Sequence, residues 1–346
     1  MPRLYLDANA TVPPLPEVVA VVAKALAEDW ANPTSLHREG QRARFLVEEA
    51  RRTIADGLRV PPGELVFCAS ATEALHLLIR GLRPALGDRP AVVFRGEHSA
   101  CLNPLKDWRA VRWLPCPLDG AATIVQMAAN NETGLLYPMP QLPGTVRIKD
   151  CAQAWGKVPV DLADCDAAVF SGHKMGGPRG AALLWLRPSL PWQPLMEGPQ
   201  ERRRRGGTED LPAILGLAEA ARHVPARIER NAALAALRDR LEAEVLSWSP
   251  DYEAIGRGLP RLPNTSALLL RGHTGAAVQI ALDLAGFAVS TGSACHSGAT
   301  EPSHAILALG FGEAEARSVI RLSLLPDTRE SDVDALLQAL KRTLKR

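Results

Sequence analysis

The chain has 346 residues, of which 47% are hydrophobic and 23% are charged. These values are typical of a folded globular protein and exclude a disordered or fibrous chain. The 40 basic and 38 acidic residues are interspersed and leave a formal net charge of +2, so no extended basic face for nucleic acid is expected. The length predicts one large domain and a smaller one.

The N-terminal segment lacks the pattern of an export signal, which is a charged stretch followed by an apolar core and a cleavage site. No apolar run approaches the length of a membrane span. The six cysteines are scattered and lack CxxC spacing, which predicts reduced thiols in the cytoplasm, with no disulfide framework and no metal site. Arg202–Arg205 form the one basic run. Such a run is usually a solvated patch, but this one precedes a Gly-Gly-Thr turn, where an arginine could serve an anionic ligand.

Short apolar runs between residues 60 and 190 predict strands, and a helical pattern begins near Thr72. The strand candidates are residues 64–70, 90–96, 122–130, 145–150, 166–172 and 180–187. Strands that are apolar on both faces, with helices between some of them, predict an α/β domain with a mostly parallel sheet. Ligands of such sheets lie beyond the carboxyl ends of the strands.

The last third of the chain predicts a smaller α+β unit. A long helical stretch, residues 213–246, is interrupted by Pro225. After it come a strand within 261–272, a helix around 275–286, the polar segment STGSACHSG (290–298), a helix near 303–309, a strand in 318–325 and a final helix at 330–344.

Polar residues stand where the predicted strands end. Ser70 to Glu73 close the first strand and open a helix, so backbone N–H groups there could bind an anion, although these residues taken alone favour a simple helix cap. Asp150 ends one strand and Lys174 follows the next. A carboxylate and an amine so placed suggest pyridoxal phosphate (PLP), because its pyridinium nitrogen needs a carboxylate and its aldehyde an amine. The alternative for Lys174 is a solvated loop lysine.

The motifs of the chain resemble those of the class V aminotransferase superfamily: SGHKMGGPRGAALLW, ANNETG, DCAQ followed by GKVPVD, and SATEALHLLIRG. With YLDANATVPP, NPTSLHREG, GEHSA, GGTED, STGSACHSG, EPSHAILALG and IRLSL, the chain resembles the cysteine desulfurases. It is most similar to the group with an SGSAC-type loop, which includes housekeeping and nitrogen-fixation iron–sulfur desulfurases. The resemblance implies a PLP fold type I large domain at 14–228. Residues 1–13 with 229–346 would form a small domain that carries the cysteine loop.

The resemblance implies a role for each matching cofactor position. Lys174 would hold PLP covalently and move protons, Asp150 would pair with the ring nitrogen, Gln153 would bind the ring hydroxyl, and His98 would stack on the ring and relay protons. Four residues would bind the phosphate: Ala71, Thr72, Ser171 and His173. Thr208 would reach the phosphate of a neighbouring subunit, which implies a homodimer.

The substrate implied is L-cysteine. Arg321 lies in an apolar strand, where an arginine is costly unless paired; it would bind the substrate carboxylate, or it forms a structural ion pair. Asn131 would add a hydrogen bond to the carboxylate or to the cofactor. Cys295, as a thiolate, would take the substrate sulfur as a persulfide and leave L-alanine. His296 either activates this thiol or faces solvent.

Two other hypotheses about the function remain open. The chain could be a selenocysteine lyase or another class V PLP enzyme, or an accessory protein that keeps the fold without turnover. The persulfide acceptor could be an iron–sulfur scaffold or another sulfur carrier.

The chain departs from the family pattern in two regions. Little room for helix remains between His98 and Asn131, and residues 137–144 are proline-rich where relatives carry a helix. With no C-terminal extension after Arg346, delivery to an iron–sulfur scaffold is less expected than the desulfurase chemistry itself.

Overall fold

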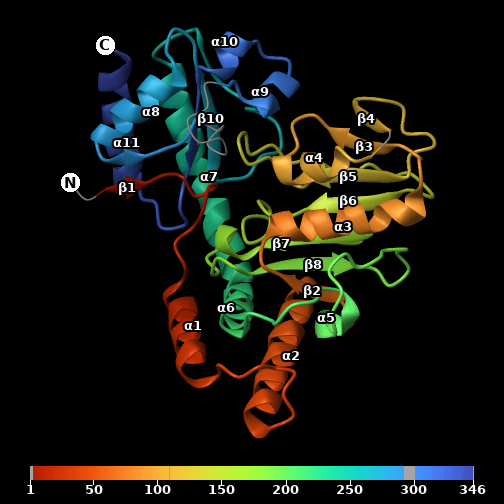
Figure 1. Cartoon of the computed structure of the whole chain (residues 1–346). Coiled ribbons are helices and arrows are strands. Elements are labelled where there is room, and N and C mark those ends of the chain that lie inside the picture. The colour runs from red at the N-terminus through yellow and green to blue at the C-terminus, as the bar shows by residue number, and fades with distance from the viewer. Residues whose placement is uncertain (1–2, 109, 292–300, 346) are drawn as a thin grey trace. The chain divides into compact units, whose positions relative to one another are not determined.

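The structure is a computed structural model that describes residues 3–108, 110–291 and 301–345. It contains two compact units (Figure 1). The large unit comprises residues 12–128 and 138–225. The small unit comprises residues 1–11, 129–137 and 226–346.

A seven-stranded sheet forms the large unit. The strand order is β2-β8-β7-β6-β5-β3-β4, and every neighbouring pair is parallel except the two that include β8. The strands are β2 Leu65–Cys68, β3 Ala91–Phe94, β4 Val111–Leu114, β5 Thr123–Met127, β6 Val146–Asp150, β7 Ala167–Ser171 and β8 Ala182–Leu186. This confirms the predicted α/β class with a mostly parallel sheet.

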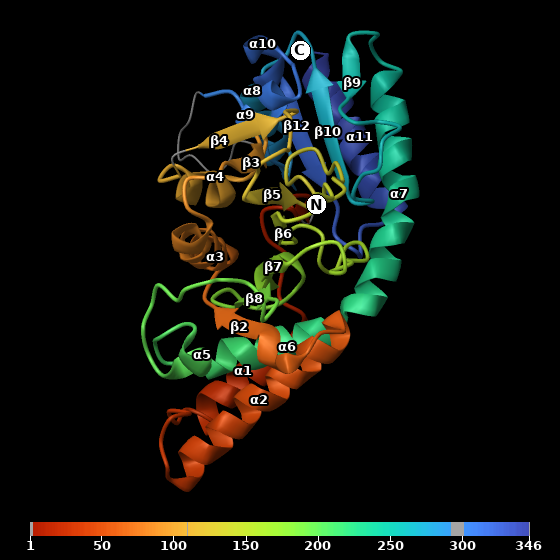
Figure 2. The same ribbon diagram turned by 90° about the vertical axis from the view of Figure 1, so that its right-hand side faces the viewer.

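Strands β2, β7 and β8 are buried on both faces, which is why they are apolar without alternation. In β6, Arg147 and Lys149 alternate with apolar residues. Phe67 of β2 and Phe170 of β7 face one hydrophobic core with α1, α2 and α6, while Val66 and Val169 face the other with α3 and α4 (Figure 2). The helices are α1 Pro16–Glu28, α2 Arg38–Leu58, α3 Ala71–Leu86, α4 Ser99–Leu105, α5 Gln200–Arg203 and α6 Leu211–Arg222, with 3₁₀ turns η1 Pro62–Glu64 and η2 Gly172–Lys174. Loops at the carboxyl ends of the parallel strands therefore stand on a rigid support.

A three-stranded antiparallel sheet of order β12-β10-β9 forms the centre of the small unit. A short parallel pair, β1-β11, continues into isolated bridges with β12, at Asp7 with Ser323 and at Ser290 with Arg321. Alternate side chains of β10 and β12 enter two cores, one shared with α7, α8 and α11 and the other with α9 and α10. The elements are β1 Leu4–Tyr5, α7 Val224–Leu246, β9 Tyr252–Ala254, β10 Thr265–Leu270, α8 Gly275–Leu284, β11 Phe287–Ala288, α9 His304–Ala308, α10 Glu313–Ala316, β12 Val319–Ser323 and α11 Glu330–Leu344.

The predicted helical stretch around Pro225 is two helices, α6 and α7. Pro225 is the second residue of α7, in the first turn, where a missing backbone N–H breaks no helical hydrogen bond. Within the described ranges, no helix combines the length and the apolar character that crossing a bilayer requires.

Candidate functional site

The carboxyl ends of β6 and β7 bring the predicted cofactor residues together. These parallel strands pair with Asp150 opposite Val169, so Asp150 and Ser171 end at the same edge of the sheet. The turn η2 follows Ser171 directly and carries Lys174 at its end. A β-carbon at Gly172 would lie 2.8 Å from the carbonyl oxygen of Ala181, so only glycine lets the chain turn this close to β8.

Asp150 is a buried carboxylate with positive charges acting on it. It is 7% exposed, its Oδ1 accepts the Ala152 N–H at 2.9 Å, and the Cys101 thiol lies 3.7 Å from Oδ2. Burial is the largest effect and raises the pKa of Asp150 above its ordinary value, while the Ala152 N–H and the charges of His98 and Lys174 partly offset this rise. A carboxylate in these surroundings is suited to hold a buried protonated nitrogen, since such a partner offsets its loss of hydration.

His98 caps helix α4 from just beyond β3. Its Nδ1 accepts the Ala100 N–H at 3.1 Å, which assigns the proton of a neutral ring to Nε2. The neighbouring Glu97 is fully buried and accepts the Met127 N–H at 2.8 Å. Burial raises the pKa of Glu97 well above its usual range. The loop that carries His98 is thus tied through Glu97 to the end of β5.

Gln153 lies in the turn after β6, 6% exposed, and its Oε1 accepts a hydrogen bond from Lys157 Nζ at 2.6 Å. The sequence reasoning identified Gln153 but gave Lys157 no role. The signal was present in GKVPVD, directly after DCAQ, where a lysine stands four residues beyond the glutamine.

The first turn of α3 and the turn η2 supply groups suited to an anion. The Ser70 hydroxyl accepts the Glu73 N–H at 3.1 Å, so it acts as the helix cap, and the N–H groups of Ala71 and Thr72 have no partner within the helix. Burial first, then the charges of Lys174, Arg179 and Lys157, lowers the pKa of His173 to about 4. A neutral imidazole can donate to a phosphate oxygen without adding a charge.

Thr208 follows a loop that strong ion pairs hold in place. Glu201 is 4% exposed and pairs with both terminal nitrogens of Arg51, at 2.9 and 2.7 Å. Arg205 Nε lies 2.7 Å from Glu73 Oε1, which ties the Gly-Gly-Thr turn to the start of α3. Thr208 itself is exposed in this single chain.

The small unit contains the predicted substrate-binding pair. Arg321 on β12 is 3% exposed; its Nη2 donates to Asp7 Oδ1 at 2.6 Å and its Nη1 to the Asn131 carbonyl oxygen at 3.0 Å. Asn9 Nδ2 donates to the same carbonyl at 3.1 Å. Among the described residues, Arg321 Nε is buried without a hydrogen-bond partner. The sequence reasoning missed Asp7, although YLD precedes the ANAT run that opens the chain.

Cys295 and His296 lie outside the described residues, but the residues on either side of their segment are placed. Ser290 forms backbone hydrogen bonds with Arg321, N–H to O at 3.2 Å and O to N–H at 2.6 Å. Ser303 Oγ donates to Glu132 Oε2 at 2.6 Å and accepts the Ile306 N–H at 3.2 Å, capping α9. The described flanks of the cysteine segment thus contact Arg321 and the neighbour of Asn131.

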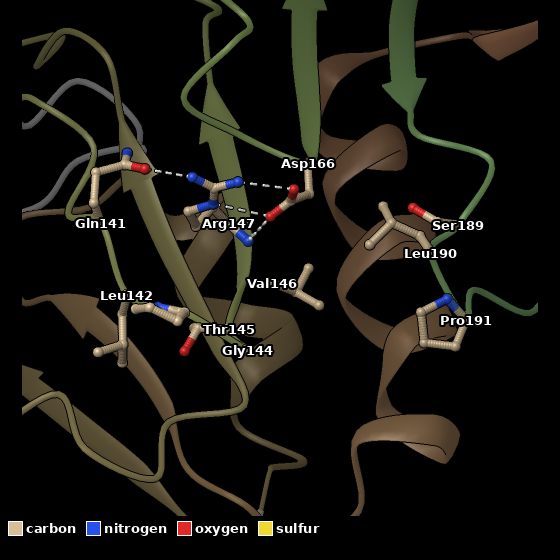
Figure 3. A pocket seen from close by; sticks show the side chains of 11 residues that line it. Gln141, Leu142, Gly144, Thr145, Val146, Arg147, Asp166, Ser189, Leu190 and Pro191 are labelled. Carbon is tan, nitrogen blue, oxygen red and sulfur yellow. Dashed lines mark hydrogen bonds and ion pairs between the residues drawn. The ribbon is translucent and has the colours of Figure 1, made fainter.

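A cavity of about 470 Å³ lies at the opposite end of β6 from Asp150 (Figure 3). Val146 and Arg147 at the start of the strand line it, together with the proline-rich loop and residues 189–191. Arg147 forms a two-pronged ion pair with Asp166 at 3.0 Å. This cavity is separated from the cofactor residues by the length of the strand.

In the part of the chain that the structure describes, His, Cys, Asp and Glu side chains form no cluster that could hold a metal ion.

Residues 4–336 match the family described as aminotransferase class-V. The chain belongs to this family. It is 36% identical to a protein named cysteine desulfurase from Cereibacter sphaeroides, over 98% of this chain and 95% of that one. A solved structure named NifS-like protein superposes with a TM-score of 0.90, at 28% identity and over 99% of both chains. A structure named SspA in complex with cysteine superposes with a TM-score of 0.79, at 28% identity, over 93% of this chain and 99% of that one.

The candidate site residues belong to the two compact units. The large unit brings together the ends of β6 and β7, the His98 loop and the first turn of α3. The small unit brings Arg321 to the Asn131 backbone and to the start of the cysteine segment. Thr208 stands apart from these groups in sequence and is exposed.

Proposed function

We propose that this member of the aminotransferase class-V family is a PLP-dependent cysteine desulfurase, which converts L-cysteine to L-alanine and leaves a persulfide on Cys295. The observation that carries the proposal is the buried Asp150 carboxylate at the end of β6, on which the charges of His98 and Lys174 act. The relatives named cysteine desulfurase and the similar structure solved with cysteine support the choice of substrate.

The donor set fits PLP. Asp150 would hold the protonated ring nitrogen, and Lys174 would hold the aldehyde carbon. The N–H groups of Ala71 and Thr72, with Ser171 and the neutral His173, would bind the phosphate. When bound, PLP supplies an electron sink that acidifies the Cα–H of an attached amino acid. Lys174, released from the aldehyde, would then take and return the proton at the substrate Cα.

Arg321 would orient the substrate through its carboxylate. The guanidinium already has partners in Asp7 and the Asn131 carbonyl, which fix its plane and leave other N–H groups for the ligand. The structural ion pair and the substrate role are therefore compatible in this proposal. Asn131 contributes its backbone oxygen to the arginine, and its side chain would bind the carboxylate or the cofactor.

Cys295 would receive the sulfur. Its thiolate attacks the substrate sulfur, the Cβ–S bond of the substrate breaks, an S–S bond forms, and the carbon skeleton leaves as L-alanine. Atoms balance without an external oxidant, because one thiol and one cysteine give one persulfide and one alanine.

We further propose that a homodimer performs this reaction, with Thr208 at the phosphate of the neighbouring subunit. The proposed acceptor of the persulfide is a protein, either an iron–sulfur scaffold or a sulfur carrier.

An assay of alanine and sulfide release from L-cysteine, with a thiol reductant, tests the proposal. Wild type is expected to be yellow and to release both products in equal amounts. Cys295→Ala is expected to bind PLP but lose sulfide release, and Lys174→Ala to lose both products. Parallel assays with L-selenocysteine and with an amino donor that lacks sulfur separate this function from those of a selenocysteine lyase or an ordinary aminotransferase. Protein that stays colourless with PLP, or full sulfide release by Cys295→Ala, contradicts the proposal.

A further inference from the structure

The turn that follows β6 contains a second buried lysine beside the candidate site. Lys157 is 2% exposed and Gln153 is 6% exposed. Backbone hydrogen bonds from Ala154 N–H to Cys151 O (3.1 Å) and from Lys157 N–H to Ala154 O (3.0 Å) curl the turn. This curl brings the two side chains together, with Lys157 Nζ 2.6 Å from Gln153 Oε1.

This contact determines which way the Gln153 carboxamide faces. An ammonium group carries donors and no acceptor, so only the carboxamide oxygen can lie beside Lys157. The Nε2 group must then lie at the opposite end of the planar carboxamide. Where a carboxamide has no such partner, its oxygen and nitrogen ends have nearly the same shape and can exchange by a half-turn.

We propose that Lys157 is a positioning residue, which orients Gln153 so that an N–H group and not an oxygen faces the ring hydroxyl of PLP. This inference rests on the proposed function, in which Gln153 binds that hydroxyl. A deprotonated ring oxygen only accepts hydrogen bonds, so an N–H donor stabilises it and a second oxygen repels it. Lys157 acts through Gln153 and has no contact with substrate in this role.

Two further contacts support the proposal. The charge of Lys157 helps to lower the pKa of His173, after burial and the charges of Lys174 and Arg179, which places Lys157 close to the proposed phosphate site. The Trp155 ring packs edge-on against Phe170 of β7, with centroids 5.1 Å apart. Because Trp155 lies between Gln153 and Lys157 in the turn, this packing holds both residues in a fixed relation to β7.

The first experiment compares Lys157→Met with Lys149→Met in PLP-loaded protein. Lys149 is also buried, at 7% exposure, but it donates to the Asp161 carbonyl and to Asp164 and does not bond Gln153. We expect Lys157→Met to raise the pH midpoint of the bound cofactor's visible absorbance by about one unit and to weaken PLP binding about tenfold, since the N–H donor is no longer held in place. Lys149→Met is expected to keep the wild-type midpoint.

Gln153→Glu tests the orientation without removing the lysine. A carboxylate keeps a strong partner for Lys157, so the fold should survive with a urea midpoint close to that of wild type, but it presents no N–H to the cofactor. The absorbance midpoint is expected to rise as in Lys157→Met. An unchanged midpoint in Gln153→Glu overturns the inference.

A double-mutant cycle shows whether Lys157 works through Gln153. In a Gln153→Leu background, Lys157→Met is expected to cause no additional shift of the absorbance midpoint. Additive shifts, or a Lys157→Met midpoint equal to that of Lys149→Met, overturn the inference while leaving the desulfurase proposal in place. Wild type that fails to bind PLP overturns both.

Discussion

Arg321 joins three features in one residue: a fixed charge, almost complete burial and an ion pair with Asp7. A buried arginine needs such a partner, because an unpaired charge in an apolar strand costs several kcal/mol. The same partner limits how the guanidinium can turn. The planar fork of Arg321 is therefore presented in one orientation to a ligand carboxylate, and its geometry matters as much as its charge.

Arg321→Lys keeps the charge and loses the planar fork. We expect kcat/KM for L-cysteine to fall about 100-fold, a loss of about 2.7 kcal/mol of binding in the transition state, because a lysine cannot hold Asp7, the Asn131 carbonyl and the substrate together. Arg317→Lys is the matched control; Arg317 lies four residues earlier, is 43% exposed at its side chain and forms an ion pair with Glu313. Equal rates for both variants would contradict the substrate role of Arg321.

His173 predicts a pH dependence of stability in cofactor-free protein. Burial, followed by nearby positive charges, lowers its pKa to about 4 in the folded chain, below the ordinary value of 6.5. Between those values the unfolded chain binds a proton that the folded chain does not, so this group makes stability decrease as pH falls from 6.5 towards 4. With solvent screening allowed for, the loss is on the order of 1 kcal/mol.

Urea unfolding at pH 7 and pH 5 checks this expectation. The change in the free energy of unfolding between the two pH values should be smaller in His173→Gln than in wild type. At pH 7 both states of wild type carry a mostly neutral ring, so the substitution should show little charge effect there. An identical pH dependence in the two proteins would rule out His173 as the source.

The segment Gln200–Arg203 has an unfavourable backbone conformation that buried contacts stabilise. Glu201, Arg202 and Arg203 all have positive φ, at 47°, 59° and 64°. Such a left-handed turn costs roughly 1–2 kcal/mol per non-glycine residue. The buried pair of Arg51 with Glu201, and the hydrogen bond from the Phe67 N–H to Glu201 at 2.8 Å, offset this cost. The turn keeps its conformation because Arg51 of α2 and the Phe67 N–H of β2 bind the Glu201 carboxylate.

Arg51→Ala is expected to destabilise the protein by about 3–5 kcal/mol, because it leaves the Glu201 carboxylate buried without its main partner. Arg52→Ala is the control: Arg52 pairs with Glu49, but its side chain is 54% exposed, so the loss should stay within about 0.5 kcal/mol. Urea midpoints of the two variants provide the comparison. Similar losses would show that the buried pair does not carry the turn.

Elements were predictable from sequence where one local pattern decides them. The strand that ends at Ser171 is apolar on both faces, and the final helix at residues 330–344 has a clear helical period. The antiparallel direction of β8 was not predictable, because a strand buried on both faces looks the same in either direction. Asp7 and Arg321 lie 314 residues apart, so no local pattern could pair them. Lys157 and Gln153 are close in sequence but meet in an irregular turn without a period.

For the whole molecule, the exposure of Thr208 fits a residue that serves another subunit. The ion pairs of Glu201 and Arg205 fix the loop before Thr208 to α2 and α3, yet Thr208 itself is exposed in this single chain. A fixed loop with an exposed hydroxyl at its end is a suitable way to complete a neighbouring phosphate site. In a symmetric dimer each subunit would both give and receive this contact.

Complementation between two inactive variants tests this arrangement. We expect Lys174→Ala and Thr208→Val each to lose most activity at limiting PLP. Co-expressed with different tags, they should recover about 25% of wild-type activity, because random pairing makes half of the dimers mixed and each mixed dimer has one intact site, with Lys174 from one subunit and Thr208 from the other. If Thr208 serves its own subunit, every site in the mixed dimer lacks one of the two residues. Absence of recovery in purified mixed dimers would then refute the shared site, and elution of wild type as a monomer would refute it independently.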